Sequence, residues 1–350
     1  MKITDLEFYL LQVPRAAPLK PVRSLLIRLA TDAGVDGWGE MPALWRADEL
    51  GARRDVLMPT LAGRNVCDIE ELIRLDVMGS APLCCGIEMA CWDALGRISG
   101  QPLCHLFGGL YRRGVPLAVR LPPGDFDEVA VWSREYAARG FHTQVVCGSG
   151  QPEDDATLLA AVHAATGDRI ELRIDAANAY DLESARELDT LLRRQSVQLV
   201  LDPLRDAEFD QVASLRRQTA LPLAISTGIV DPASVLAVVR SGAAQHVVVD
   251  LEQVGGLSRA RACATVAETG EIVALLGGRR PTLGVATAAL VALVAATPGF
   301  ASADESSYPQ LADDVLVESL PLVDGMLSVP QGPGLGVEID RAKVDRYLVT

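Results

Sequence analysis

Lysine is nearly absent from this chain of 350 residues, because it occurs at Lys2, Lys20 and Lys343 and nowhere else. A lysine base on an internal strand is therefore excluded. Long apolar runs are missing too, since the most apolar segment, residues 283–298, is shorter than the ~20 residues that a membrane-spanning helix needs. Aromatic residues make up 5% of the chain and apolar residues 49%, so we expect a core of aliphatic side chains.

Positive charge is also scarce. The formal net charge of −14 argues against a nucleic-acid partner, because phosphate binding needs a basic face. Asp5 and Glu7 interrupt the apolar N-terminal segment, so we expect no export signal. The seven cysteines are odd in number and lie mostly in apolar runs, which is typical of reduced thiols. We therefore predict a cytoplasmic protein that acts on a small molecule and has neither a nucleic-acid nor a membrane partner.

The first 114 residues read as an α+β domain. Residues 3–13 and 22–31 are rich in branched side chains, and the segment DAGVDGWGE supplies a glycine-rich hairpin. Helical periodicity follows at residues 68–77 and 83–98, and Gly100 and Pro102 end the second helix.

From residue 115 to residue 315 the pattern is that of parallel βα units. Strands are expected at residues 115–121, 143–147, 171–175, 199–202, 223–226, 246–250 and 272–276. Helices are expected at residues 126–139, 153–166, 182–195, 206–218, 232–241 and 257–269. Seven units and a poorly defined turn after Gly277 favour a closed α/β barrel over an open sheet. The tail, residues 316–350, is strand- and turn-like and does not continue the repeat.

Six segments stand out in this order of elements. They are Gly37-Trp38-Gly39-Glu40, EMACWDALGRISGQPLCHLFGG (residues 88–109), Gly140-Phe141, Arg173-Ile174-Asp175, Gly255-Gly256-Leu257 and VPQGPGLG (residues 329–336). In their order and spacing, the chain resembles the enolase superfamily, in its mandelate racemase and muconate-lactonising branch. The resemblance implies a modified TIM barrel, an N-terminal capping domain over its mouth, a tail that returns to the cap, and a symmetric homo-oligomer.

The resemblance also implies a chemistry that this sequence does not support. Enzymes of the family remove a proton next to a carboxylate, and a magnesium ion held by three strand-end carboxylates stabilises the enediolate. Asp175 matches the first ligand, but Leu201 and Ser226 occupy the second and third positions. One carboxylate does not hold magnesium. The neighbouring Asp202 faces the other side of its strand unless the backbone twists, so we predict no metal cofactor.

The acid/base positions of the family are replaced as well. The paired lysines of the second strand match Val145 and Cys147, and the sixth-strand lysine matches Asp250. The acidic residue after the seventh unit matches Arg280.

Strand alternation nevertheless places four side chains at the C-terminal ends of the strands, where active sites of this fold lie. They are Cys147, Asp175, Ser226 and Asp250. We predict Asp250 and Asp175 as catalytic acid/base groups and Arg280 as a clamp for an anionic substrate group. Predicted substrate-binding residues in the mouth and the cap loops are Cys147, Ser226, Thr227, Lys20, Trp45 and Arg46.

Several alternatives stay open at this point. Asp250 and Arg280 could form a structural ion pair, Asp175 could be kept by hydrogen bonds alone, and Cys147 could be an inert thiol. Arg279 is expected to be solvated or to lie on the outer face, and Arg120 either lines the mouth or lies outside it. The leading hypothesis is a metal-independent isomerase, lyase or cyclase for a small anionic molecule. The alternatives are a catalytically silent relative that binds a partner, and an unusual magnesium-dependent racemase or cycloisomerase that uses Asp175 with Asp202 or Asp250.

Overall fold

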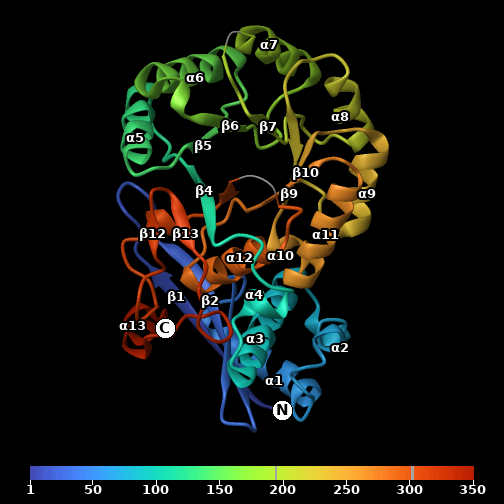
Figure 1. The fold of residues 1–350 in the computed structure, drawn as a ribbon, viewed down its shortest axis with the longest axis vertical. Coiled ribbons are helices and arrows are strands. Elements are labelled where there is room, and N and C mark those ends of the chain that lie inside the picture. The colour runs from blue at the N-terminus through green and yellow to red at the C-terminus, as the bar shows by residue number, and fades with distance from the viewer. Residues whose placement is uncertain (194, 301–302) are drawn as a thin grey trace.

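The N-terminal part of the chain is an antiparallel sheet covered by helices (Figure 1). The computed structural model describes residues 1–193, 195–300 and 303–350. The strands pair in the order β1 (Ile3–Val13), β2 (Val22–Thr31) and β3 (Asp36–Pro42). The helices are α1 (Leu50–Leu61), α2 (Ile69–Leu72), α3 (Ala81–Ser99) and α4 (Leu103–Leu106). The sequence did not predict α1, which contains Pro59 and buries only two of its residues.

The second part is a parallel barrel, which confirms the predicted fold class. Its strands are β4 (Gly114–Arg120), β5 (Thr143–Cys147), β6 (Glu171–Asp175), β7 (Leu199–Leu201), β8 (Leu223–Ile225), β9 (His246–Val249) and β10 (Val273–Leu276). Each strand pairs in parallel with the next one in the sequence. The short strand β11 (Asp304–Glu305) pairs with β4, and Phe300 forms a bridge with Ala274 of β10. These two contacts close the barrel.

Helices connect the strands around the outside of the barrel. They are α5 (Phe126–Ala138), α6 (Pro152–Thr166), α7 (Leu182–Leu192), α8 (Phe209–Arg216), α9 (Pro232–Ser241), α10 (Leu251–Val254) and α11 (Leu257–Thr269). The helix expected at residues 182–195 ends at Leu192, and residue 194 of that range lies outside the described residues. In the described part of the chain, no helix has both the length and the apolar character to cross a membrane.

The largest differences from the expected elements lie in the last quarter of the chain. After the turn at Gly277, residues Gly284–Ala296 form helix α12, whose residues are almost all buried. A helix that is apolar on every side has no periodic pattern, so residues 284–296 carry no helical periodicity. The tail contains β12 (Leu322–Val323), β13 (Met326–Ser328) and the unexpected helix α13 (Arg341–Tyr347). Strand β13 pairs with β4, and Leu348 forms a bridge with Leu11 of the cap sheet.

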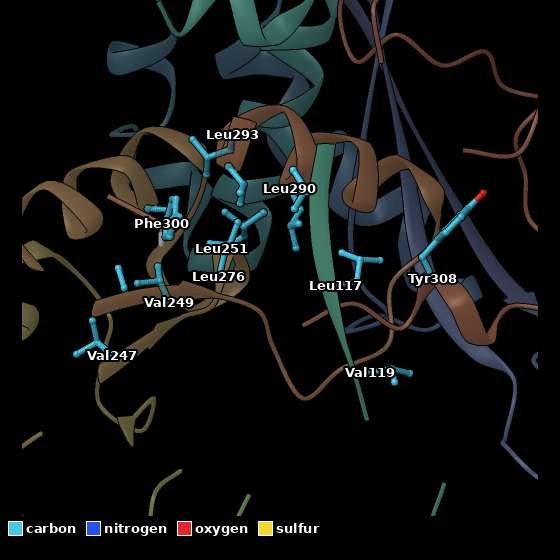
Figure 2. Close-up of a cluster of buried hydrophobic side chains, with 14 of the residues drawn as sticks. Leu117, Val119, Val247, Val249, Leu251, Leu276, Leu290, Leu293, Phe300 and Tyr308 are labelled. Carbon is cyan, nitrogen blue, oxygen red and sulfur yellow. The ribbon is translucent and has the colours of Figure 1, made fainter. Parts of the chain in front are cut away.

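Helix α12 lies between the cap and the barrel (Figure 1). It contacts β3 on the cap side and β4 and α11 on the barrel side. Figure 2 shows its residues Leu290 and Leu293 in one cluster with Leu117 of β4, Val249 of β9 and Phe300. Burial of such aliphatic side chains contributes roughly 1.5–3 kcal/mol each, so this cluster fixes α12 on the barrel.

Buried carboxylates of the cap hold the loops of the barrel mouth. Glu40 accepts hydrogen bonds from the backbone N–H groups of Leu283 (2.7 Å) and Ala286 (2.9 Å), at the start of α12. Glu88 of α3 accepts from the N–H of Ser258 (3.0 Å), at the start of α11. The cap residues that carry the family resemblance therefore fix the two barrel segments that follow β9 and β10.

Two glycines let the cap strand β3 touch helix α3 backbone to backbone. A Cβ on Gly37 would lie 2.0 Å from the carbonyl oxygen of Ala90, and one on Gly39 would lie 2.0 Å from that of Gly86. Both distances are far below van der Waals contact. Because the opposing atoms belong to the backbone, no side-chain rotation relieves the clash.

We predict that Gly39→Ala lowers the free energy of unfolding by about 3 kcal/mol or more, since β3 and α3 would have to separate. Gly51→Ala is the matched control, because a Cβ on Gly51 meets open space in α1. That variant should be unchanged or stabilised by up to about 1 kcal/mol. Urea denaturation of both variants checks this. Equal stabilities would contradict the close approach of β3 and α3.

Candidate active site

A cavity of about 370 Å³ opens at the C-terminal ends of the barrel strands. Its polar lining comes from β4, from the residue after β8, from the segments after β9 and β10, and from β11. These polar residues are Arg120, Ser226, Asp250, Glu252, Gln253, Arg279, Arg280 and Glu305. The apolar wall includes Leu201 and Val248. The mouth is therefore a small polar pocket of the size that a small organic molecule needs.

Arg279 lies at the centre of this mouth. Its Nε is 2.8 Å from Oδ2 of Asp175, and its Nη2 is 2.6 Å from Oδ1 of the same carboxylate. Nη2 also donates to Oδ2 of Asp202 at 2.7 Å. The expectation that Arg279 faces outward is wrong. The loop that carries it has no strand alternation to indicate its orientation, and Glu40 fixes the loop from the cap.

Asp175 is an ion-paired carboxylate. Besides Arg279, it contacts Nη1 of Arg120 at 2.9 Å. Of the two alternatives for Arg120, the structure shows the one in which this side chain lines the mouth. Burial by itself would raise the pKa of Asp175, but the hydrogen bonds from Arg279 and the charge of Arg120 outweigh it and hold the pKa below its ordinary value. Asp175 is therefore ionised at neutral pH, which suits a counterion better than the acid/base group predicted from the sequence.

Asp202 turns toward Arg279 although it is adjacent to the strand residue Leu201, and Leu201 rather than Asp202 lines the main cavity. Its φ of +46° twists the backbone out of the strand alternation. Its Oδ1 accepts from the N–H groups of Ser226 (2.7 Å) and Thr227 (3.0 Å), and its Oδ2 accepts from the Ser226 hydroxyl at 2.5 Å. The backbone twist that Asp202 needs to leave the strand alternation is therefore present. The three hydrogen bonds that its carboxylate accepts offset the strain of this twist.

Asp250 and Glu252 form the other side of the mouth. Asp250 follows β9, and its Oδ1 accepts from the backbone N–H of Glu252 at 2.9 Å. Burial raises the pKa of Asp250. Burial, together with the charges of Asp250 and Glu40, raises the pKa of Glu252 to about 8. Glu252 was missed from the sequence because it belongs to α10, a helix of four residues in a segment that had no predicted structure.

Arg280 is the most exposed cation of the mouth, with 59% of its side chain accessible. Its ion pair in the described structure is with Glu252, whose Oε2 lies 3.6 Å from Nη1, beyond hydrogen-bond distance. Asp250 has no ion pair with Arg280 among the described contacts. The structural ion pair between these two residues, one of the alternatives from the sequence, is therefore not seen. Arg280 therefore keeps donors that can face a ligand.

The remaining predicted mouth residues, Ser226, Cys147 and Thr227, lie in three different places. Ser226 lines the main cavity. Cys147 is exposed, with its Sγ 3.5 Å from Nη1 of Arg120, and it lines an adjacent cavity of about 150 Å³. Thr227 does not line the main cavity, and its hydroxyl accepts from the Asn178 amide at 3.1 Å.

The three predicted cap-loop residues are not at the mouth. The ring of Trp45 packs edge-on against Phe8, with a centroid distance of 5.2 Å, because the cap core offers it apolar neighbours. Arg46 is exposed and pairs with Asp48, and Lys20 is exposed. The residues that this part of the cap does bring to the smaller cavity are Arg15 and Leu19.

The donor set of the mouth does not fit a magnesium ion. Leu201 and Ser226 stand where the resemblance implies carboxylates, and Arg279 occupies the carboxylates of Asp175 and Asp202. Throughout residues 1–193, 195–300 and 303–350, no group of three or more His, Cys, Asp or Glu side chains is placed to hold a metal ion. Magnesium needs several hard oxygen ligands in octahedral geometry, and a guanidinium between the carboxylates prevents that arrangement.

Comparison with known proteins places the whole chain among enolase-like enzymes. Residues 17–108 match the sequence model of the mandelate racemase / muconate lactonizing enzyme N-terminal domain, and residues 128–343 match that of the enolase C-terminal domain-like family. Muconate cycloisomerase 1 from Rhodococcus opacus is 26% identical over 99% of this chain and 98% of its own. L-Ala-D/L-Glu epimerase from Bacillus subtilis is 24% identical over 96% and 97%.

A solved structure agrees with these relatives. The crystal structure of N-succinyl Arg/Lys racemase from Bacillus cereus has a TM-score of 0.91 at 23% identity, covering 100% of this chain and 99% of its own. At this identity the likeness shows a common fold. Together with the sequence relatives, which are a cycloisomerase and an epimerase, the comparisons support an isomerase-type enzyme.

We predict that Glu252→Gln flattens the dependence of stability on pH. The pKa of Glu252 is about 8 in the folded state and near 4.5 when unfolded. The folded protein therefore gains stability that is complete below pH 4.5 and is lost as the pH rises through 8, on the order of 5 kcal/mol at most. Thermal unfolding from pH 5 to 9 should show the wild type losing stability relative to the variant. Parallel curves would contradict the raised pKa.

Proposed function

Because the chain belongs to the mandelate racemase / muconate lactonizing enzyme family of enolase-like barrels, we propose that it is an isomerase-type enzyme for a small carboxylate that works without a metal ion. One observation carries the proposal. Two carboxyl groups with raised pKa, Asp250 and Glu252, meet an accessible guanidinium, Arg280, in one cavity. Groups with shifted pKa in a cleft are the usual mark of acid/base catalysis.

The anionic end of the substrate binds Arg280. This side chain is the least paired cation of the mouth, and a guanidinium binds a carboxylate with two parallel hydrogen bonds. A carboxylate at this position also withdraws Arg280 from Glu252, whose Oε2 has no hydrogen-bond partner in the described structure. Substrate binding then leaves Glu252 free to face the reacting carbon.

Asp250 and Glu252 share the proton transfers. Glu252, with a pKa of about 8, holds its proton at neutral pH and acts as the general acid. Asp250 acts as the base, since burial makes its carboxylate more basic than a solvated one. Asp250 takes a proton from the carbon next to the substrate carboxylate, and Glu252 donates one to the carbon skeleton. The class of this reaction is isomerisation, with elimination and cyclisation as its close variants.

Asp175 takes a different part from the one predicted. As an ionised carboxylate between Arg120 and Arg279, it orients the two cations and carries no proton. Ser226 lines the wall of the cavity. The symmetric homo-oligomer and the cytoplasmic location stay predictions.

A catalytically silent relative that serves as a binding partner is the second candidate. Arg279 favours it, because this side chain fills the centre of the mouth with internal ion pairs. The two candidates are separated by a thermal-shift screen of small carboxylates and lactones. A ligand that binds the native mouth raises the unfolding midpoint of the wild type, and Arg280→Ala should lose that shift.

We predict that Asp250→Asn lowers turnover of a substrate found in this way by 10²–10⁴-fold, the usual range for a general base. Binding of the substrate should be nearly unchanged, because Arg280 is intact. Asp154→Asn, on the exposed face of α6, is the control and should keep full activity. If Asp250→Asn keeps its turnover and only loses thermal stability, Asp250 is a structural residue and the silent candidate gains.

We also predict that turnover survives exhaustive dialysis against a chelator. The donor set around Asp175 holds no place for a divalent ion, so removal of metal should change turnover less than twofold, within the range of ordinary assay error. Adding magnesium back should have no effect. Loss of activity that magnesium restores would exclude the metal-free mechanism.

A further inference from the structure

One nitrogen atom joins two strand ends in the barrel mouth. Nη2 of Arg279 lies 2.6 Å from Oδ1 of Asp175, at the end of β6, and 2.7 Å from Oδ2 of Asp202, directly after β7. Its Nη1 lies 3.4 Å from the hydroxyl of Ser226, directly after β8. The same guanidinium thus reaches three successive strand ends, the places from which the family resemblance implies the ligands of an ion.

The charges around this guanidinium require a cation at that point. Asp175 and Asp202 are almost completely buried, with 2% and 1% of their side chains accessible. Arg120 is shared between Asp175 and Glu305, since its Nε is 2.7 Å from the Glu305 carboxylate. Without Arg279, three carboxylates would face one guanidinium in a desolvated pocket. Buried charges of that kind are strongly destabilising unless they are compensated.

We propose that Arg279 is a built-in cation that replaces the divalent ion of this barrel mouth. It holds the carboxylates of Asp175 and Asp202 together, and it presents an Nη1 N–H to the substrate carboxylate in the cavity that it lines. Its side chain remains 36% accessible, which leaves that face open. The part about the substrate rests on the proposed function, whereas the part about the two carboxylates does not.

An arginine cation differs from a metal ion in ways that suit this pocket. It stays protonated at every physiological pH, and chelators do not remove it. It carries one positive charge, so it stabilises an enediolate less strongly than a divalent ion does. The second guanidinium of the cavity, Arg280, supplies the additional positive charge on the substrate side.

The test removes the guanidinium and asks whether its place accepts a metal. Arg279→Ala leaves Asp175, Asp202 and the Ser226 hydroxyl around an open position. Titration with Mn²⁺, followed by electron paramagnetic resonance, should show about one bound ion per chain at up to about 1 mM, the range of weak carboxylate sites. Magnesium should also raise the unfolding midpoint of this variant.

The controls keep a cation in place. The wild type, Arg280→Ala and Arg279→Lys should bind no Mn²⁺ in the same range. Adding Asp202→Asn to Arg279→Ala should weaken Mn²⁺ binding at least tenfold. If Arg279→Ala does not fold, Arg279→Gln, which is neutral but fills more of the space, takes its place in the titration.

The proposal is overturned if the neutral variant folds and binds no more Mn²⁺ than the wild type does. It is also overturned if the wild type itself binds Mn²⁺ at this position with equal affinity. Neither measurement needs a substrate or turnover. A variant that binds no Mn²⁺ therefore leaves the proposed isomerase function intact, wild-type Mn²⁺ binding counts only against its metal-free mechanism, and an inactive wild type leaves the cation assignment intact.

Discussion

The ion pairs of Arg279 with Asp175 and Asp202 are the interaction on which the mouth depends. Each buried carboxylate would cost several kcal/mol if its charge were left unpaired, so the loop that carries Arg279 has one acceptable position. The cap then secures that position, because Glu40 binds the N–H groups of Leu283 and Ala286 where the loop enters α12. A carboxylate far from the chemistry in sequence therefore determines the shape of the cavity.

This arrangement divides the carboxyl groups of the mouth into two classes. On one side, Asp175 is paired with guanidinium groups, and its pKa lies below the ordinary value. On the other side, Asp250 and Glu252 are buried with little compensation, and their pKa values are raised. Environments that separate the pKa values of neighbouring acids are what acid/base catalysis needs. Carboxyl groups thus serve as the counterion behind the cavity wall and as the proton carriers in the cavity.

Sequence reasoning predicted the barrel closely because strand alternation and turn residues are local signals. It placed β5 and β6 at their observed bounds, and it put Ser226 and Asp250 at the mouth. It did not predict that Arg279 faces the mouth together with Arg280, since a loop without periodicity carries no such signal. Sequence reasoning also missed the position of Glu252, the helix α12 and the packing of Trp45 against Phe8. Contacts between distant parts of the chain determine all three, and local sequence patterns do not show such contacts.

The charges around Arg279 explain why Leu201 and Ser226 can stand where the family resemblance implies metal ligands. Three carboxylates around a doubly charged ion leave one net negative charge, and two carboxylates around a guanidinium leave the same. Leu201 and Ser226 remove two carboxylates relative to the pattern that the family resemblance implies, and the twisted backbone of Asp202 returns one of them. The planar guanidinium then binds Asp175 through Nε and Nη2 and reaches Asp202 with the remaining hydrogen of Nη2. The loss of the two ligands and the inward turn of Arg279 are therefore one coupled change, because either of them alone would leave a buried charge without its partner.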